Sequence, residues 1–139
     1  MTKTPALTPA QEQFLLTMPH AIVATIRKDG TPQLTPTWYL WDGAAFIIST
    51  LTWTRKYNNL KRDPRVTLCI DGFQRHTQYV QVSGTAEIVE GDVAEATKAI
   101  IRKYEPDEET TQRHWDEAKA DRVIIRLRPD RWQWRYPGR

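Results

Sequence analysis

The chain has 139 residues, of which 40% are hydrophobic and 27% are charged, and its formal net charge is +3. This composition excludes a disordered or fibrous protein, and the length predicts one domain over residues 1–139. No apolar run approaches the roughly 20 residues of a membrane-spanning helix, and no apolar signal stretch opens the sequence. We therefore expect a cytoplasmic protein without a membrane partner.

The first half of the chain predicts a short helix and three strands. A capping pattern at residues 8–11 predicts a helix that ends near Pro19. Two Asp-Gly pairs, at residues 29–30 and 42–43, predict tight turns between β-rich runs. The runs themselves cover residues 21–26, 33–41 and 44–50. We expect these three strands to form an antiparallel meander.

The second half of the chain mixes helices with longer strands. Helices are predicted over residues 54–63, 91–104 and 108–119, and strands over 66–70, 78–89 and 123–128, the last extended past Pro129 to Trp134. Tight turns between the early strands favour an antiparallel sheet, because parallel strands need helical crossovers. We therefore predict a mainly β protein with peripheral helices, in which the strands form a small antiparallel barrel.

Several classes of function have no support in the sequence. One cysteine, Cys69, cannot form an intrachain disulfide, and three scattered histidines give no zinc-binding pattern, so no metal is expected. Charges of both signs are spread along the chain without a nucleic-acid-binding motif, so no nucleic-acid partner is expected. Glycine-rich phosphate loops, nucleophile elbows and metalloprotease motifs are also absent.

The segment from residue 48 to residue 66 is the most informative for function. Ser49 and Thr50 offer two hydroxyls at a strand end, and the helix that follows carries Arg55 and Lys56 in its first turn. Backbone amides, the helix dipole and two cations would then converge on one point, an arrangement that binds phosphate. The alternative is a basic helix face that lies in solvent.

The chain also has six tryptophans, which is a large number for its length. Those on predicted strands are Trp38, Trp41, Trp132 and Trp134. Core packing accounts for such residues in most proteins, whereas a planar ring system bound between strands would also need aromatic surfaces. Both explanations stay open.

Four stretches of the chain resemble a known family. They are residues 24–36 (ATIRKDGTPQLTP), 56–66 (KYNNLKRDPRV), 79–86 (YVQVSGTA) and 121–127 (DRVIIRL), the last followed by Pro129 and Pro137-Gly138. In this order they are similar to the opening hairpin, phosphate-side helix, long strand and last strand of the flavin/deazaflavin oxidoreductases related to pyridoxamine 5′-phosphate oxidase. The branch of F-420-dependent enzymes is the most similar. The resemblance covers residues 14–139 and implies a split β-barrel.

The resemblance also implies a cofactor site. Lys56 matches the family's phosphate-binding lysine, with the hydroxyls of Ser49 and Thr50 beside it, and Asn59 matches the helix asparagine. The strand along which the tricyclic ring lies is matched by Gln33, Thr35, Pro36 and Thr37. Close relatives often have a basic residue at the position of Thr54, and here Arg55 supplies the charge one position later.

Family members are homodimers with both sites at the subunit interface. The resemblance therefore implies that this chain forms a homodimer, in which Trp132 or Trp134 of the partner subunit would complete the pocket.

The activity implied is hydride transfer between the deazaflavin coenzyme F-420 and a small electrophilic organic substrate. Arg55, Lys61 and Arg62 favour F-420 over FMN, because the F-420 tail carries carboxylates beyond its phosphate. Two alternatives stay open: an FMN-dependent enzyme of the pyridoxamine 5′-phosphate oxidase type, and a non-catalytic cofactor-binding protein. The cofactor supplies the hard chemistry in such enzymes, so no catalytic residue is assigned.

Overall fold

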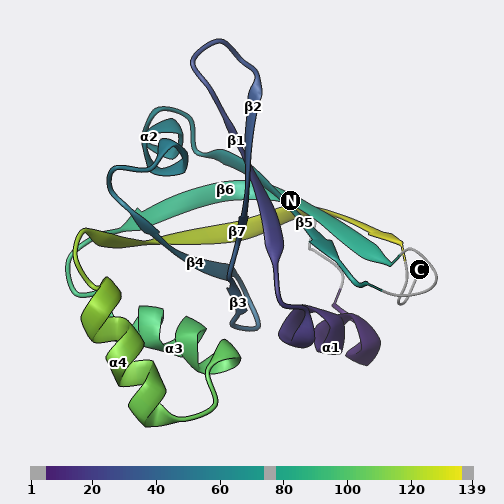
Figure 1. The fold of residues 1–139 in the computed structure, drawn as a ribbon. Helices are drawn as coiled ribbons and strands as arrows, with labels where there is room; N and C mark the ends of the chain where they lie inside the picture. Colours follow the sequence, from purple (N-terminus) through teal and green to yellow (C-terminus); the bar gives the residue numbers. More distant parts are fainter. Residues whose placement is uncertain (1–5, 74–77, 136–139) are drawn as a thin grey trace.

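The computed structural model describes residues 6–73 and 78–135, so the predicted match at Pro137-Gly138 lies outside the described residues. Seven strands in this part of the chain form a sheet that curls into a half-barrel (Figure 1). The strands are β1 (Ala21–Ile26), β2 (Pro32–Thr37), β3 (Leu40–Trp41), β4 (Phe46–Leu51), β5 (Arg65–Asp71), β6 (Tyr79–Val89) and β7 (Arg122–Arg135).

The strand order across the sheet is β2-β1-β5-β6-β7-β4-β3, and every neighbouring pair is antiparallel. Four helices accompany the sheet in the described part of the chain. They are α1 (Pro9–Thr17), α2 (Arg55–Arg62), α3 (Ala94–Tyr104) and α4 (Glu108–Ala118). The predicted fold class, a mainly β split barrel with peripheral helices, is confirmed.

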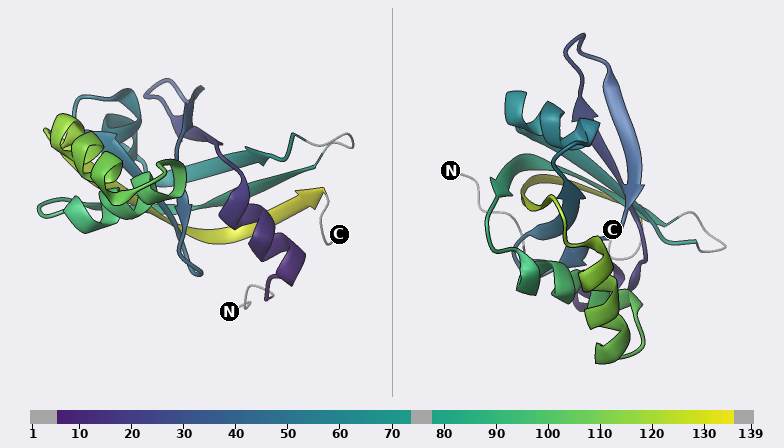
Figure 2. Two further views of the ribbon diagram at one scale, coloured as in Figure 1. Left: turned by 60° about the horizontal axis from the view of Figure 1, so that its bottom comes forward. Right: turned by 60° about the vertical axis from the view of Figure 1, so that its left-hand side comes forward.

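The helices lie on different sides of the sheet. Figure 2 shows α3 and α4 side by side at one end of the molecule, where α3 also packs against β4. The α2 helix packs against β1 and β6, next to the β1–β2 hairpin. Within residues 6–73 and 78–135 we find no helix with the length and apolar character needed to span a bilayer.

Both Asp-Gly turns form as predicted. Gly30 and Gly43 have φ values of +87° and +97°, a backbone conformation that side chains with a Cβ rarely adopt. The Asp29 carboxylate accepts a hydrogen bond from the backbone N–H of Thr31 at 3.0 Å, which closes the β1–β2 turn. The turn at Gly43 joins β3 to β4.

The predicted strand over residues 33–41 is two strands, and the predicted meander is wrong. β2 pairs with β1, whereas β3 pairs with β4. Between them Tyr39 is fully buried, and its backbone N–H donates to the Tyr104 hydroxyl at 3.0 Å. The Tyr39 hydroxyl donates to the Leu15 carbonyl at 2.7 Å. Because these contacts take the chain out of the ladder, β2 and β3 stand at opposite ends of the strand order.

Two apolar clusters fill the space on either side of the sheet. The larger lies inside the half-barrel and includes Phe46, Ile48, Leu68 and Leu127. The smaller cluster lies between the sheet and α3, and it includes Ile47. Adjacent β4 residues thus belong to different clusters, as the alternation of a strand buried on both faces requires.

β6 and β7 form a long ribbon that is interrupted by a bulge. The register shifts between Ser83 and Gly84, and Pro129 lies opposite Gly84. Proline lacks the N–H that a sheet ladder needs, so a bulge is where a strand tolerates it. A Cβ on Gly84 would lie 1.9 Å from the carbonyl oxygen of Arg128, so the close approach of the two backbones requires glycine.

Lys103 joins α3 to the connection between β2 and β3. Its ammonium group donates to the carbonyls of Met18 at 2.7 Å and Tyr39 at 3.1 Å. The same Nζ lies 3.5 Å from the centre of the Tyr39 ring. Burial lowers the pKa of Lys103 to about 8.

We expect Lys103 to make the protein more stable as the pH rises from about 8 to 10.5. In this range the unfolded lysine keeps its proton while the folded lysine loses it, so raising the pH favours the folded state. The contribution is at most about 1.4 kcal/mol per pH unit. Urea unfolding of the parent and of Lys103→Met at several pH values gives the free energy of unfolding against pH for each protein. The parent should show the steeper rise between pH 8 and 10.5, and equal slopes would contradict the prediction.

Candidate functional site

The α2 helix is fixed to the end of β4 by the side chain of Thr54. The Thr54 hydroxyl accepts a hydrogen bond from the backbone N–H of Tyr57 at 3.4 Å and donates to the Leu51 carbonyl at 2.8 Å. It also lies 3.1 Å from the hydroxyl of Thr50. Thr54 is therefore the N-cap of the predicted basic helix, and Thr50 helps to hold it in place.

Lys56, in the first turn of α2, is buried without a counterion. The residue is 9% exposed, and its Nζ has no hydrogen-bond or ion-pair partner among the described residues. Burial, and then the nearby guanidinium of Arg122, lower the pKa of Lys56. A buried cation without a partner is unfavourable, and a bound anion would relieve that cost.

Two predicted site residues, Gln33 and Asn59, are linked through Thr25. The Asn59 side-chain amide donates to the Thr25 hydroxyl at 3.1 Å, and that hydroxyl donates to Gln33 Oε1 at 3.1 Å. All three side chains are buried, and the chain of bonds ties α2 to the β1–β2 hairpin. Thr25 was not predicted as a site residue. Its place opposite Gln33 in the hairpin is the signal that could have found it.

The other three residues of the predicted ring-binding strand lie along β2. Thr35 and Thr37 share a face with Gln33, whereas Pro36 lies on the opposite face and is exposed. The Thr37 hydroxyl donates to the Trp38 carbonyl at 2.8 Å. The Thr35 hydroxyl oxygen is buried and has no hydrogen-bond partner in the described structure, so its hydrogen-bonding capacity is unused.

The two hydroxyls predicted to flank the lysine face different elements. Thr50 contacts the N-cap of α2, whereas the Ser49 hydroxyl lies 3.3 Å from that of Thr97 on α3. Side chains of consecutive strand residues point to opposite faces of a sheet, which explains the separation. The structure does not bring the Ser49 and Thr50 hydroxyls together.

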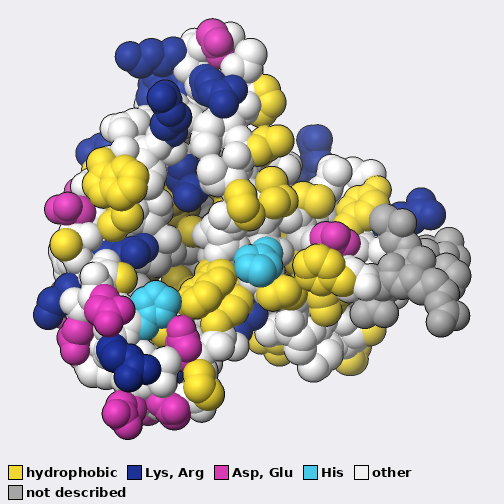
Figure 3. All heavy atoms as spheres, viewed as in Figure 1, with side chains coloured by type: hydrophobic (Ala, Val, Ile, Leu, Met, Phe, Trp, Pro, Cys, Tyr) yellow, Lys and Arg dark blue, Asp and Glu magenta, His cyan; other side chains and the backbone are white. Residues whose placement is uncertain are grey.

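A basic cleft lies between α2 and the turn of the β1–β2 hairpin. It has a volume of about 450 Å³ and is lined by Arg27, Lys28, Asp29, Arg55, Asn58, Asn59 and Arg62. Four of these side chains are cationic and one is anionic. Figure 3 shows Lys and Arg side chains gathered over this end of the molecule. The cleft therefore attracts anions.

One predicted cation, Lys61, lies outside the basic cleft. Its Nζ is 3.3 Å from the Tyr57 hydroxyl and 4.0 Å from Glu90. Arg62 instead lines the cleft, where it donates to Asn59 Oδ1 at 3.4 Å and to the Ile26 carbonyl. Arg27 and Lys28 complete the cleft and were missed, because their role depends on the hairpin folding back toward α2.

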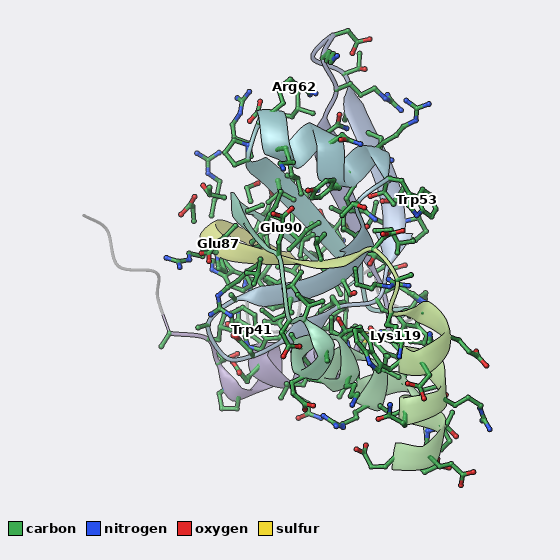
Figure 4. The ribbon with its side chains drawn as sticks, turned by 90° about the vertical axis from the view of Figure 1, so that its left-hand side faces the viewer. Trp41, Trp53, Arg62, Glu87, Glu90 and Lys119 are labelled. Carbon is green, nitrogen blue, oxygen red and sulfur yellow. The ribbon has the colours of Figure 1, made fainter. Side chains whose placement is uncertain are left out.

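Trp132 and Trp134 lie far from α2 within the same chain. Their rings stack at 5.8 Å, and Trp132 contacts Trp41 edge-on at 5.7 Å. Both are half-buried against the larger apolar cluster. In Figure 4, Arg62 lies near the top of the view and Trp41 lies well below it, on the far side of the β6–β7 ribbon. The structure therefore does not bring these tryptophans to Lys56 in one chain. Trp38 packs elsewhere, stacked on Tyr104 at 4.1 Å.

No cluster of three or more His, Cys, Asp or Glu side chains suited to a metal ion occurs in residues 6–73 and 78–135. The chemistry of the site is that of its cations and hydroxyls: a buried lysine, a basic cleft and the orphaned hydroxyl of Thr35.

A curled antiparallel sheet with a short basic helix beside its first hairpin defines the split-barrel class of proteins. A family model described as Pyridoxamine 5′-phosphate oxidase matches residues 7–136, and the chain belongs to this family.

Solved structures agree with this assignment. The chain is 30% identical to a protein named F420 reductase, with a TM-score of 0.77, over 91% of this chain and 98% of that one. It is 26% identical to a conserved hypothetical protein from Mycobacterium tuberculosis, with a TM-score of 0.77, over 96% of this chain and 89% of that one. The heme storage protein HutZ from Vibrio cholerae, 16% identical over 88% and 90% of the two chains with a TM-score of 0.66, shares the fold.

Proposed function

We propose that the protein is an oxidoreductase that transfers a hydride between coenzyme F-420 and a small electrophilic organic substrate. The observation that carries the proposal is the buried, unpartnered Lys56 beside a cleft lined by four cations. F-420 has one phosphate and a tail of carboxylates. Lys56 suits the phosphate, and the cations of the cleft suit the carboxylates. The 30% identity to a protein named F420 reductase supports the choice.

The chain's own residues would bind and orient the cofactor. Lys56 would hold the phosphate, and Arg55 and Arg62 would face the carboxylates of the tail. The face of β2 that carries Thr35 would lie against the ring, and the Thr35 hydroxyl oxygen has no competing hydrogen-bond partner in the described structure. When bound, the deazaflavin would supply the hydride chemistry, and the protein would supply orientation and exclusion of water.

Equilibrium binding of F-420 and FMN, followed by tryptophan fluorescence, tests the proposal. We expect F-420 to bind more tightly than FMN. We also expect the protein loaded with reduced F-420 to transfer a hydride to an electrophilic substrate, with oxidised F-420 as the second product. Tighter binding of FMN would favour the flavin-dependent alternative. Cofactor binding without any turnover would favour a non-catalytic carrier.

The basic cleft predicts a difference between the two cofactors. FMN ends at its phosphate, so Arg55→Gln combined with Arg62→Gln should weaken F-420 binding about tenfold while changing FMN binding less. Added salt should reduce the difference, because it screens exposed charges. Lys61→Gln is the matched control, since Lys61 lies by Glu90 outside the cleft. Equal losses for both cofactors would contradict this assignment of the cleft.

We also propose that the protein is a homodimer with its sites at the subunit interface. Ile22 and Leu34 lie on the outer face of the β1–β2 hairpin and are 39% and 59% exposed, which supports a partner on that face. The exposed edge of Trp132 or Trp134 of the partner subunit would complete the pocket. Light scattering should give about twice the chain mass of 16.2 kDa, and a monomer mass at micromolar concentration would contradict the dimer.

A further inference from the structure

The start of β7 is held against the start of α2. Arg122 pairs with Leu51 in the β4–β7 register, and the Asp121 carbonyl accepts a hydrogen bond from the Thr52 N–H at 3.0 Å. The Leu51 carbonyl also accepts from the backbone N–H of Thr54 at 3.1 Å and from its hydroxyl at 2.8 Å. These bonds bring the first residue of β7 and the N-cap of α2 to the same end of β4.

Arg122 is half-buried and uses only part of its guanidinium group. Its Nε donates to the carbonyl of Ala118, the last residue of α4, at 2.7 Å. Its two Nη groups have no hydrogen-bond or ion-pair partner among the described residues. The guanidinium therefore keeps free donors.

Neither Lys56 nor Arg122 forms an ion pair among the described residues, although Asp121 directly precedes Arg122 in the sequence. Two carboxylates at α2 and on α4 are engaged elsewhere. Glu90 accepts a hydrogen bond from Tyr57 at 2.5 Å and pairs with Lys61. Asp116 pairs with Lys119 at 3.8 Å. In the described structure, the Lys56 and Arg122 side chains therefore repel one another without an acidic partner between them. Burial lowers the pKa of both groups, and the charge of Arg122 lowers the pKa of Lys56 further.

A buried lysine next to a half-buried arginine, without a counterion, raises the energy of the folded protein, and an anion bound between the two cations removes most of that cost. The first amides of a helix have no partner within the helix, so those at the start of α2 add donors at the same place. The Arg122 guanidinium adds a fork of donors that fits two phosphate oxygens.

We infer that Lys56 and Arg122 together form a binding site for a phosphate group, in which Arg122 is the second cation. The identity of the phosphate ester rests on the proposed function, but the site itself suits the phosphate of F-420 or of FMN. A role limited to capping α4 through Ala118 is the competing explanation for Arg122. That role gives Arg122 no effect on phosphate affinity.

The experiment compares Arg122→Gln and Arg122→Lys with the parent, using inorganic phosphate, F-420 and FMN as separate probes in calorimetric titrations. Arg126→Gln is the matched control, because Arg126 lies on the same strand and face but pairs with Asp42 at 2.8 Å. We expect Arg122→Gln to weaken the binding of every phosphate-bearing probe about tenfold or more, Arg122→Lys to restore part of it, and Arg126→Gln to leave it unchanged.

A second measurement on the parent protein does not depend on any variant folding. Adding phosphate should raise the pKa of Lys56, because the anion favours the charged lysine. An NMR titration of the Lys56 side chain, with and without phosphate, measures this pKa. An unchanged Lys56 pKa, absence of phosphate binding, or equal losses in Arg122→Gln and Arg126→Gln would overturn the inference.

If F-420 binds Arg122→Gln as it binds the parent, the inference fails and the proposed function stands. If phosphate binding depends on Arg122 but neither cofactor binds, the inference stands and the proposed function fails.

Discussion

Replacing Lys56 by alanine should weaken cofactor binding by roughly 1.5–3 kcal/mol, the range for a charge-assisted hydrogen bond, while the fold persists. The fold should persist because Lys56 has no hydrogen-bond or ion-pair partner in the described structure and its buried charge opposes folding. Titration of F-420 and FMN gives the loss of affinity, and urea unfolding gives the stability of the same variant.

Leu60→Ala is the opposite case on the same helix. Leu60 is 3% exposed and belongs to the larger apolar cluster, so its truncation should lower the free energy of unfolding by about 2–5 kcal/mol. Cofactor affinity, measured where this variant is still folded, should change less than in Lys56→Ala. If Lys56→Ala binds both cofactors as the parent does, the assignment of Lys56 to a phosphate is wrong.

Gly84→Ala should destabilise the protein by about 3 kcal/mol, at the upper end of the cost of overpacking. A methyl group there would lie 1.9 Å from the Arg128 carbonyl oxygen and 3.2 Å from the Leu127 side chain. The contact is with backbone at the β6–β7 bulge, so the long ribbon itself has to move.

Gly91→Ala provides the comparison for this variant. Gly91 has a φ of +97° but open space around the position of a Cβ, so alanine there costs only the backbone penalty of roughly 1–2 kcal/mol. Urea unfolding of both variants measures the two costs separately. If Gly84→Ala proves no less stable than Gly91→Ala, the bulge is not as tightly packed as the structure describes.

Local signals in the sequence predicted most of the fold. An Asp-Gly pair specifies a turn through its own backbone and carboxylate, so both hairpin turns were correct without knowledge of the rest. The break between β2 and β3 has no local signal of this kind. It depends on Tyr104, which is 65 residues away and accepts the hydrogen bond of the Tyr39 N–H.

The candidate site likewise combines features that the local sequence predicts with features that depend on long-range contacts. The N-cap at Thr54 and the basic first turn of α2 are local features, and they were predicted. Which cations share a cleft is not a local property. Consecutive helix residues point roughly 100° apart, so Lys61 lies beside Glu90 while Arg62 lies beside the hairpin, and only the fold decides which direction faces the cleft. Arg122 had no distinguishing signal at all, since its proximity to Lys56 arises only when β7 pairs with β4.

The place of β7 also bears on how the chain folds during synthesis. β7 follows every other strand in the sequence, yet it lies between β6 and β4. Until residues 122–135 leave the ribosome, the nascent chain can form only two separate pieces of sheet, β2-β1-β5-β6 and β4-β3, each with an edge that awaits the same strand. Unpaired edges attract other chains, and non-local pairing is slow. Completion of the half-barrel is therefore a late event, and the growing polypeptide needs protection from aggregation until its final strand is inserted.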